Sequence, residues 1–435
     1  MSFELTFLPL EECLDALIDY RGKTPVKTDS GIPLITAKII KGGRIEAPTE
    51  FIAKDDYVAW MRRGIPEEGD VVLTVEAPLG EVAQLGSEKI ALAQRVVTLR
   101  GKAGLLDSTY LLYLLQTEEM QSQLKSRATG TTVLGIKQSE LRKVTLSLPP
   151  FDLQLSAAAT LKALDDRITL LRETNTTLEA IAQALFKSWF VDFDPVRAKL
   201  EGSTPEGMID ATAALFPDGF EESELGLVPR GWRVSTLGES TSYLSRGISP
   251  KYVENAGIVV INQKCIRDFA LDLTKARRHD QSQRKVDGRE LQVGDVLVNS
   301  TGVGTLGRVA QVLGLDEPAI VDSHVTVVRA GAALSWNYLG LSMMRRQAEI
   351  ESMGEGTTGQ TELSRGKLAI LKLVVPSAVV LHEFDAAVVP LRERFAANQK
   401  QAQTLATLRD TLLPRLISGQ LRLPDVKSLI EESVA

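Results

Sequence analysis

An internal duplication constrains the fold of this chain more than any other feature of its sequence. Residues 21–25 (RGKTP) and 69–71 (GDV) recur 225 positions later as RGISP and GDV, and residues 79–83 (LGEVA) recur 227 positions later as LGRVA. Because separate segments keep almost one offset, the chain is expected to contain two copies of one structural unit.

Each copy is expected to consist of a globular domain followed by a long helix. Short apolar runs between Gly and Pro residues, such as residues 71–75 and 296–299, are typical of strands in a mixed α/β domain. Beyond Pro149-Pro150 and Pro376, apolar residues recur at spacings of three and four, which is the heptad pattern of a coiled coil. The two seams are Leu161, Leu164, Ile168, Leu171, Asn175, Leu178, Ala182 and Leu185, and Val388, Leu391, Phe395, Asn398, Ala402, Leu405, Arg409 and Leu412.

Two matched long helices in one chain most simply pair with each other. If the first helix leads away from the first domain and the second helix returns, the pair is antiparallel. A parallel pair would need the linker to run back along a rod of roughly 54 Å, the length of about 36 helical residues. The linker is long enough for that alternative.

We therefore predict an α+β protein with two mixed α/β domains, a pair of long antiparallel coiled-coil helices between them, and an internal pseudo-twofold duplication. The predicted boundaries are 1–151 and 232–377 for the domains, 152–191 and 378–420 for the helices, 192–231 for an acidic linker, and 421–435 for a C-terminal tail.

One polar residue interrupts each seam, Asn175 in the first helix and Asn398 in the second. A buried polar residue in a seam fixes the register of a coiled coil at a cost in stability. The alternative is an exposed asparagine where the seam frays.

The composition favours a folded cytoplasmic protein. The chain has 435 residues, more than one hydrophobic core usually supports, and its two cysteines, Cys13 and Cys265, lie far apart. No segment approaches the roughly 18 consecutive apolar residues of a membrane span, and the N-terminus lacks the cationic start of a signal peptide. The three histidines are not spaced as metal ligands, so no metal site is predicted.

Two short motifs resemble catalytic fingerprints but fail in context. Residues 302–307 (GVGTLG) satisfy G-x-G-x-x-G, yet residues 308–312 (RVAQV) suggest a strand where a dinucleotide site needs a helix, so we predict a turn. Residues 148–151 (LPPF) lack the amide of the adenine-methyltransferase motif and are interpreted as a helix start. No nucleophile motif is found, and no catalytic residue is predicted.

The net charge of -6 argues against a nucleic-acid partner, but the charges are unevenly distributed. Acidic residues concentrate in 201–224, whereas 264–289 is rich in Lys and Arg. Basic, hydroxyl and amide side chains at matching places in both copies suit phosphate contacts and base reading, although for any single cation a solvated surface role is the alternative. The candidates are Thr36, Lys38, Lys41, Arg44, Arg62 and Arg63 in the first domain, and Gln263, Lys264, Arg267, Arg277, Arg278 and Lys285 in the second.

Nearly the whole chain resembles the specificity subunits of type I restriction-modification systems. The likeness is most specific at the ends of the two helices, in residues 185–195 (LFKSWFVDFDP) and 408–419 (LRDTLLPRLISG). Gly231-Trp232 and residues 260–267 (VINQKCIR) are similar to the recognition domains of that family.

The resemblance implies two target-recognition domains, each reading one half of a split double-stranded DNA sequence, with the helices as the ruler that sets the gap. Half-sites one duplex turn apart lie about 34–36 Å centre to centre, the same order of size as the rod. It also implies two methylation subunits and, through them, two restriction subunits, and no membrane partner. No cofactor is expected on this chain, because S-adenosylmethionine, ATP and Mg belong to the partner subunits.

Seven apolar residues near the helix ends are assigned to the helical core and to docking of the methylation subunits, the alternative being that they only pack the helix pair. Trp189 and Phe190 are adjacent and cannot both face one seam, so one of them is expected to remain available to a partner. The residues are Leu185, Phe186, Trp189, Phe190, Leu412, Leu413 and Leu416.

Two other classes of function remain open. A stand-alone DNA-binding or regulatory module could use the same scaffold, and neighbouring methylase and motor genes would separate the two. A catalytic methyltransferase would need a cofactor loop, and binding of S-adenosylmethionine by the purified chain would support it.

Overall fold

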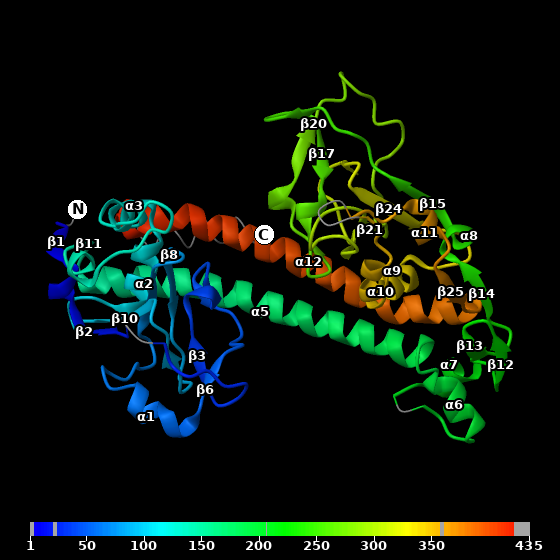
Figure 1. Ribbon diagram of the computed structural model, residues 1–435, viewed down its shortest axis with the longest axis horizontal. Helices are drawn as coiled ribbons and strands as arrows, with labels where there is room; N and C mark the ends of the chain where they lie inside the picture. The colour runs from blue at the N-terminus through cyan, green and yellow to red at the C-terminus, as the bar shows by residue number, and fades with distance from the viewer. Residues whose placement is uncertain (1–3, 21–23, 206, 357–360, 422–435) are drawn as a thin grey trace. The chain divides into compact units, whose positions relative to one another are not determined.

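The computed structural model describes residues 4–20, 24–205, 207–356 and 361–421, which form two compact units (Figure 1). Unit 1 comprises residues 1–170 and 401–435, and unit 2 comprises residues 171–400. The repeat motif at 21–25 falls partly outside the described residues, as do positions 357–360 and all but the first residue of the predicted tail. No helix within the described ranges is long and apolar enough to cross a membrane.

Unit 1 is built around a four-stranded antiparallel sheet with the order β2-β10-β7-β8. Every residue of β7 is buried, in line with its sequence VVLTV, which is apolar except for Thr74. A smaller sheet has the order β6-β3-β9, with β3 and β9 parallel, and two further pairs are β1-β11 and β4-β5. The bounds are β1 Thr6–Pro9, β2 Leu14–Asp19, β3 Ile32–Ile35, β4 Ile40–Lys41, β5 Arg44–Ile45, β6 Phe51–Ile52, β7 Val71–Val75, β8 Leu79–Gln84, β9 Ala91–Leu92, β10 Val96–Gly101 and β11 Thr145–Leu148, with helices α1 Tyr57–Trp60, α2 Ser108–Gln116, α3 Glu118–Ser126 and α4 Gln138–Leu141.

Unit 2 repeats this topology. Its main sheet has the order β15-β24-β21-β22, its second sheet has the order β16-β20-β17-β23 with β17 and β23 parallel, and β14-β25 and β18-β19 correspond to the two further pairs. Apart from β16, which adds a fourth strand to the second sheet, the sheets correspond in the two units, and this confirms the predicted duplication and the α+β class. The bounds are β14 Arg233–Thr236, β15 Thr241–Arg246, β16 Tyr252–Val253, β17 Ile258–Ile261, β18 Ile266–Arg267, β19 Ala270–Leu271, β20 Arg277–His279, β21 Val296–Asn299, β22 Val309–Gln311, β23 Ala319–Val321, β24 Val325–Ala330 and β25 Lys372–Val375, with helices α8 Leu237–Ser240, α9 Trp336–Arg345, α10 Gln347–Ser352 and α11 Arg365–Ala369.

Each main sheet contains an equivalent ion pair between an arginine and a buried aspartate at neighbouring strands. Asp70 accepts from Nε and Nη2 of Arg100 at 2.8 and 2.9 Å, and Asp295 accepts from the same two atoms of Arg329 at 2.7 Å each. The carboxylates are 2% and 0% exposed. In each unit the aspartate precedes a central strand and the arginine lies near the end of its neighbour, so the pair ties two strands together.

The two long helices, α5 (Phe151–Phe190) and α12 (Ala378–Ile417), each contribute to both units. In unit 2, Asn175 of α5 contacts Asn398 of α12, and Glu179 pairs with Arg392. Positions that advance along α5 therefore meet positions that recede along α12, so the helices are antiparallel there. This confirms the antiparallel prediction and excludes the parallel alternative.

The two seam asparagines are buried and bonded to each other. Asn175 is 9% and Asn398 1% exposed. Asn398 Nδ2 donates to Asn175 Oδ1 at 2.9 Å, and Asn175 Nδ2 donates to the Phe395 carbonyl at 3.1 Å. The alternative of a frayed, exposed asparagine is therefore wrong.

Replacing Asn398 with leucine is expected to destabilise the protein by about 1–3 kcal/mol, because Asn175 Oδ1 would stay buried without its donor. The double change Asn175→Leu with Asn398→Leu is expected to recover much of this loss, since both polar partners are then gone. Urea unfolding of the purified chains measures both values. A double variant at least as unstable as the single one would contradict the importance of the pair.

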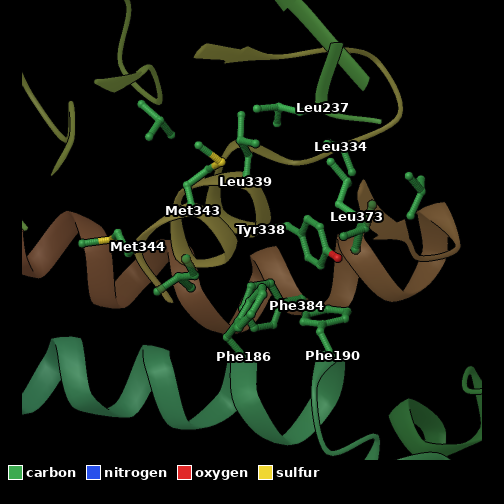
Figure 2. Packing of buried hydrophobic residues seen from close by; sticks show 14 of the residues in the cluster. Phe186, Phe190, Leu237, Leu334, Tyr338, Leu339, Met343, Met344, Leu373 and Phe384 are labelled. Atoms are coloured by element: carbon green, nitrogen blue, oxygen red, sulfur yellow. The ribbon is translucent and has the colours of Figure 1, made fainter. Parts of the chain in front are cut away.

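The end of α5 is enclosed in the core of unit 2. Phe186 and Phe190 point from α5 toward Phe384 of α12 and Tyr338 of α9 (Figure 2). Phe190 and Trp189 are each 6% exposed. The expectation that one of the two remains available to a partner is therefore wrong.

The reason is that the segment after α5 covers the face of the helix that α12 leaves open. Trp189 meets Phe216 edge-on at 5.1 Å between ring centroids, and Phe190 lies 5.9 Å from Trp232. The segment predicted as an acidic linker is thus folded onto the core of unit 2. It holds α6 Asp194–Leu200, α7 Asp210–Ala214 and a hairpin of β12 Phe220–Ser223 and β13 Gly226–Pro229.

Candidate nucleic-acid interface

A one-turn helix followed by a short hairpin presents cations at the same place in both domains. The turns are η2 (Ala37–Ile39) and η4 (Gln263–Cys265), and β4-β5 and β18-β19 follow them. Lys38 and Lys264 occupy equivalent, exposed positions on the turns, 226 residues apart. Buried residues of each turn, such as Ile39 and Cys265, anchor the backbone, so the lysines are held outward by the fold.

The next cation on each hairpin is also matched and exposed. Lys41 pairs with Glu46 at 2.7 Å, and Arg267 lies 3.7 Å from Asp268. Exposed pairs of this kind contribute little because water screens them. A phosphate can therefore compete for Lys41 and Arg267. Arg44 is half-buried on β5 and Thr36 is half-buried just before η2.

The structure separates the first-domain candidates into two groups. Arg63 Nη1 donates to the Asp19 carbonyl at the end of β2, whereas Gly42, between Lys41 and Arg44, donates its N–H to Glu81 of β8. Strands β2 and β8 are the opposite edges of the main sheet, about 14 Å apart at roughly 4.8 Å per strand. Arg62 and Arg63 therefore do not join the cluster formed by Lys38, Lys41 and Arg44.

Two second-domain candidates are engaged within the protein. Arg278 forms a bidentate pair with Glu317 at 2.9 and 2.7 Å, and these hydrogen bonds raise the pKa of Arg278 and lower that of Glu317. The Arg277 guanidinium lies 3.4 Å from the centroid of the Tyr252 ring. Lys285 is exposed in a connecting loop. The strongest cationic candidates of this domain are thus Lys264 and Arg267.

Gln263, the first residue of η4, contacts the turn between β21 and β22. Its backbone carbonyl accepts from Asn299 Nδ2 at 3.1 Å, and its side-chain Oε1 is buried without a hydrogen-bond partner. That oxygen lies 2.5 Å from where a Cβ on Gly302 would stand. The Lys264 turn therefore adjoins the β21-β22 connection.

That connection is the G-x-G-x-x-G segment. Strands β21 and β22 pair antiparallel from Val296↔Gln311 to Val298↔Val309, so the segment is a hairpin turn with a strand after it. Gly302, Gly304 and Gly307 have φ values of 107°, 69° and 80°, which favour glycine. The predicted turn is confirmed, and no helix N-terminus stands there to hold a pyrophosphate.

One site was not predicted from the sequence: a pair of polar side chains beside this turn, with a corresponding pair in the first domain. Thr301 Oγ1 lies 2.8 Å from His324 Nδ1, and in the first domain Arg95 Nη2 lies 3.8 Å from Glu76 Oε1. We call these two pairs the sheet corners. Aligning the two copies would have revealed them as matched positions with different side chains.

Comparison with known proteins gives a consistent result. Residues 17–180 match the family described as "Type I restriction modification DNA specificity domain". The MjaIX specificity subunit of Methanocaldococcus jannaschii is 26% identical over 375 residues, which cover 82% of this chain and 79% of that protein. The HindI specificity subunit of Haemophilus influenzae is 24% identical over 385 residues, which cover 77% and 82%.

A solved structure shares the fold across the chain. The type I restriction-modification S subunit from M. genitalium superposes with a TM-score of 0.59 at 15% sequence identity, and the match covers 95% of this chain and 96% of that one. The duplicated α+β topology, the sequence relatives and the specificity-domain match agree. Over most of its length the chain is similar to the specificity subunits of type I restriction-modification systems.

Proposed function

We propose that this chain is the DNA-recognition subunit of a type I restriction-modification complex, in which each recognition domain reads one half of a split target and the two helices set the gap. The observation that carries the proposal is the repetition of one domain topology with an exposed cationic turn at the same place in both copies. Shared cations suit contacts to the phosphate backbone, which is the same at both half-sites.

In this proposal the chain is non-catalytic and carries no cofactor of its own. S-adenosylmethionine, ATP and Mg would be bound by two methylation subunits and two restriction subunits. The G-x-G-x-x-G segment supports this assignment of cofactors to the partner subunits, because its glycines form a hairpin turn and not a phosphate-binding loop.

The methylation subunits would dock on the outer faces of the long helices. The core of unit 2 includes Phe186, Trp189 and Phe190, and buried residues of unit 1 include Leu412 and Leu416. The other two candidates, Leu185 and Leu413, are half-buried. Leu170 and Ile181 of α5 are 51% and 44% exposed although both are large and apolar. Apolar side chains on an otherwise polar helix surface suit a protein partner.

A map of methylated adenines in the native host, with and without this gene, tests the proposed function. We expect one split motif with a fixed gap to lose its methylation when the gene is removed. Complementation with the intact gene is the control. An unchanged methylation map in a host that expresses the complex would contradict the proposal.

Exchanging the first recognition domain for that of another specificity subunit is expected to change one half-site only. The second half-site and the gap should persist, because unit 2 and the helices are retained. The same methylation map provides the measurement. A simultaneous change of both half-sites would contradict separate reading by the two domains.

A further inference from the structure

We propose that the sheet corners, Glu76 with Arg95 in the first domain and Thr301 with His324 in the second, are specificity-determining residues that contact base edges. This inference rests on the proposed function and names the residues through which each domain would distinguish its half-site. Four observations carry it: equivalent backbone hydrogen bonds, different side chains, free hydrogen-bonding groups and, in the second domain, a position beside the cationic turn.

The backbone around the two corners is the same. The Val75 N–H donates to the Arg95 carbonyl at 3.0 Å, and the Ser300 N–H donates to the His324 carbonyl at 2.8 Å. On the other side, the Ile136 N–H donates to Val75 and the Leu363 N–H donates to Ser300, at 3.0 and 2.8 Å. Position 76 therefore corresponds to 301, and position 95 to 324.

The side chains mounted on this frame differ in chemistry. The buried ion pairs Asp70–Arg100 and Asp295–Arg329, a few residues away in each sheet, are identical. At the corners, by contrast, a carboxylate and a guanidinium in one domain correspond to a hydroxyl and an imidazole in the other. Two readers of different half-sites need this combination: a common scaffold, common phosphate contacts and divergent groups at the bases.

The corner of the first domain has hydrogen-bonding capacity to spare. Glu76 and Arg95 have side chains 46% and 47% exposed, and their 3.8 Å separation exceeds a hydrogen bond. Within the part of the chain that the structure describes, no other side-chain partner is recorded for either residue. Both line a cavity of about 420 Å³ that also includes Gln94, Thr129 and Lys137.

The corner of the second domain presents one edge of a histidine ring. The backbone N–H of His324 donates to Asp322 Oδ1 at 2.9 Å, and the ring atom Nδ1 lies 2.8 Å from Thr301 Oγ1. The contact with Thr301 orients the ring, while the side chain stays exposed. Among the described residues Nε2 has no recorded partner, so it is free to meet a base edge or a water bound to one.

The second corner also adjoins the cationic turn. Gln263, next to Lys264, bonds to Asn299 and approaches Gly302, and these two residues flank the Ser300–Thr301 segment. A duplex held at its phosphates by Lys264 would thus have its base edges close to Thr301 and His324. In the first domain, η2 with Lys38 is the corresponding element in chain order, between β3 and β4.

The chemistry of the first corner predicts part of its target. A guanidinium pairs best with O6 and N7 of guanine, and a carboxylate accepts from N4 of cytosine. Glu76 and Arg95 together therefore fit a step that contains a G·C pair in the major groove. Thr301 can contact the thymine methyl group or accept from several bases, so the second corner fits a different step.

The test exchanges the corners within the full-length chain, expressed in the native host in place of the wild type. We expect Glu76→Thr with Arg95→His to change at least one base of the first half-site and to leave the second half-site and the gap intact. Thr301→Glu with His324→Arg should change only the second half-site. The discrimination at the altered position should shift by roughly tenfold or more. Maps of methylated adenines report all of these results.

Matched controls are Lys125→Gln on α3 and Arg233→Gln on β14, exposed cations outside the corners, which should leave both half-sites unchanged. If an exchange abolishes methylation, the single changes Arg95→Gln and His324→Gln decide, because they should relax one base position. A wild-type split motif that persists in every corner variant would overturn this inference alone. Absence of any split motif with the wild type would overturn the proposed function and this inference with it.

Discussion

Replacing Phe384 with alanine is expected to destabilise unit 2 by about 3–5 kcal/mol, the largest effect of any single side chain in its core. Phe384 is fully buried on α12 and lies 4.8 Å from Phe190 and 5.7 Å from Trp189 between ring centroids. Its removal would leave a cavity between both long helices and α9 (Figure 2). Thermal or urea unfolding of the purified chain provides the measurement.

The matched control is Val379→Ala on the same helix. Val379 is 54% exposed, so its truncation should change stability by no more than about 0.5 kcal/mol. A loss below about 1 kcal/mol for Phe384→Ala would show that the aromatic cluster is not the core that joins the helices to the second domain.

Replacing Asp295 with alanine is expected to cost about 3 kcal/mol, toward the lower end for a broken buried ion pair. Arg329 would keep its charge but lose the acceptor for two N–H groups, and its guanidinium is partly exposed, which moderates the cost. The hydrogen bonds that Arg329 donates to Asp295 raise the pKa of Arg329 in the wild type. A guanidinium stays charged at ordinary pH even without them, so the variant keeps this charge. Hydrogen exchange should show lost protection in β21 and β24.

Asp70→Ala is the matched change in the first domain and should expose β7 and β10 instead. Asp295→Asn, which keeps an acceptor oxygen, should lose less stability than Asp295→Ala. Equal loss of protection in both units from either alanine variant would contradict the assignment of one such pair to each domain.

The long-period features of this fold were predictable, because they leave repeated marks on the sequence. One offset predicted two copies, the heptad spacing predicted α5 and α12, and the polar seam positions predicted that Asn175 and Asn398 are buried. The hydrogen bond between the two asparagines was not predicted. The hairpin at Gly302 was predictable from the strand-like residues that follow it. Each of these inferences depends on a repeated or neighbouring pattern of residues, which a single sequence contains.

The remaining features depend on contacts that no local pattern records. The segment after α5 is acidic overall, yet a few apolar residues such as Phe216 and Trp232 suffice to fold it onto Phe190 and Trp189. A heptad seam describes one face of a helix and says nothing of a second covering element. The sheet corners were missed because their residues lie far apart in sequence, 19 and 23 positions, and each is a single polar residue at a strand end.

Unit 1 is assembled from two distant segments of the chain, and this affects its folding during synthesis. Residues 1–170 leave the ribosome first, but the stretch of α12 that belongs to the same unit, in which Arg409 pairs with Asp165, begins only at residue 401. Until that stretch has been made, the seam residues of α5 in unit 1 lack the partner that α12 supplies. The nascent chain therefore exposes apolar surface of α5 while residues 171–400 are being made, which favours binding by chaperones and early association with other chains.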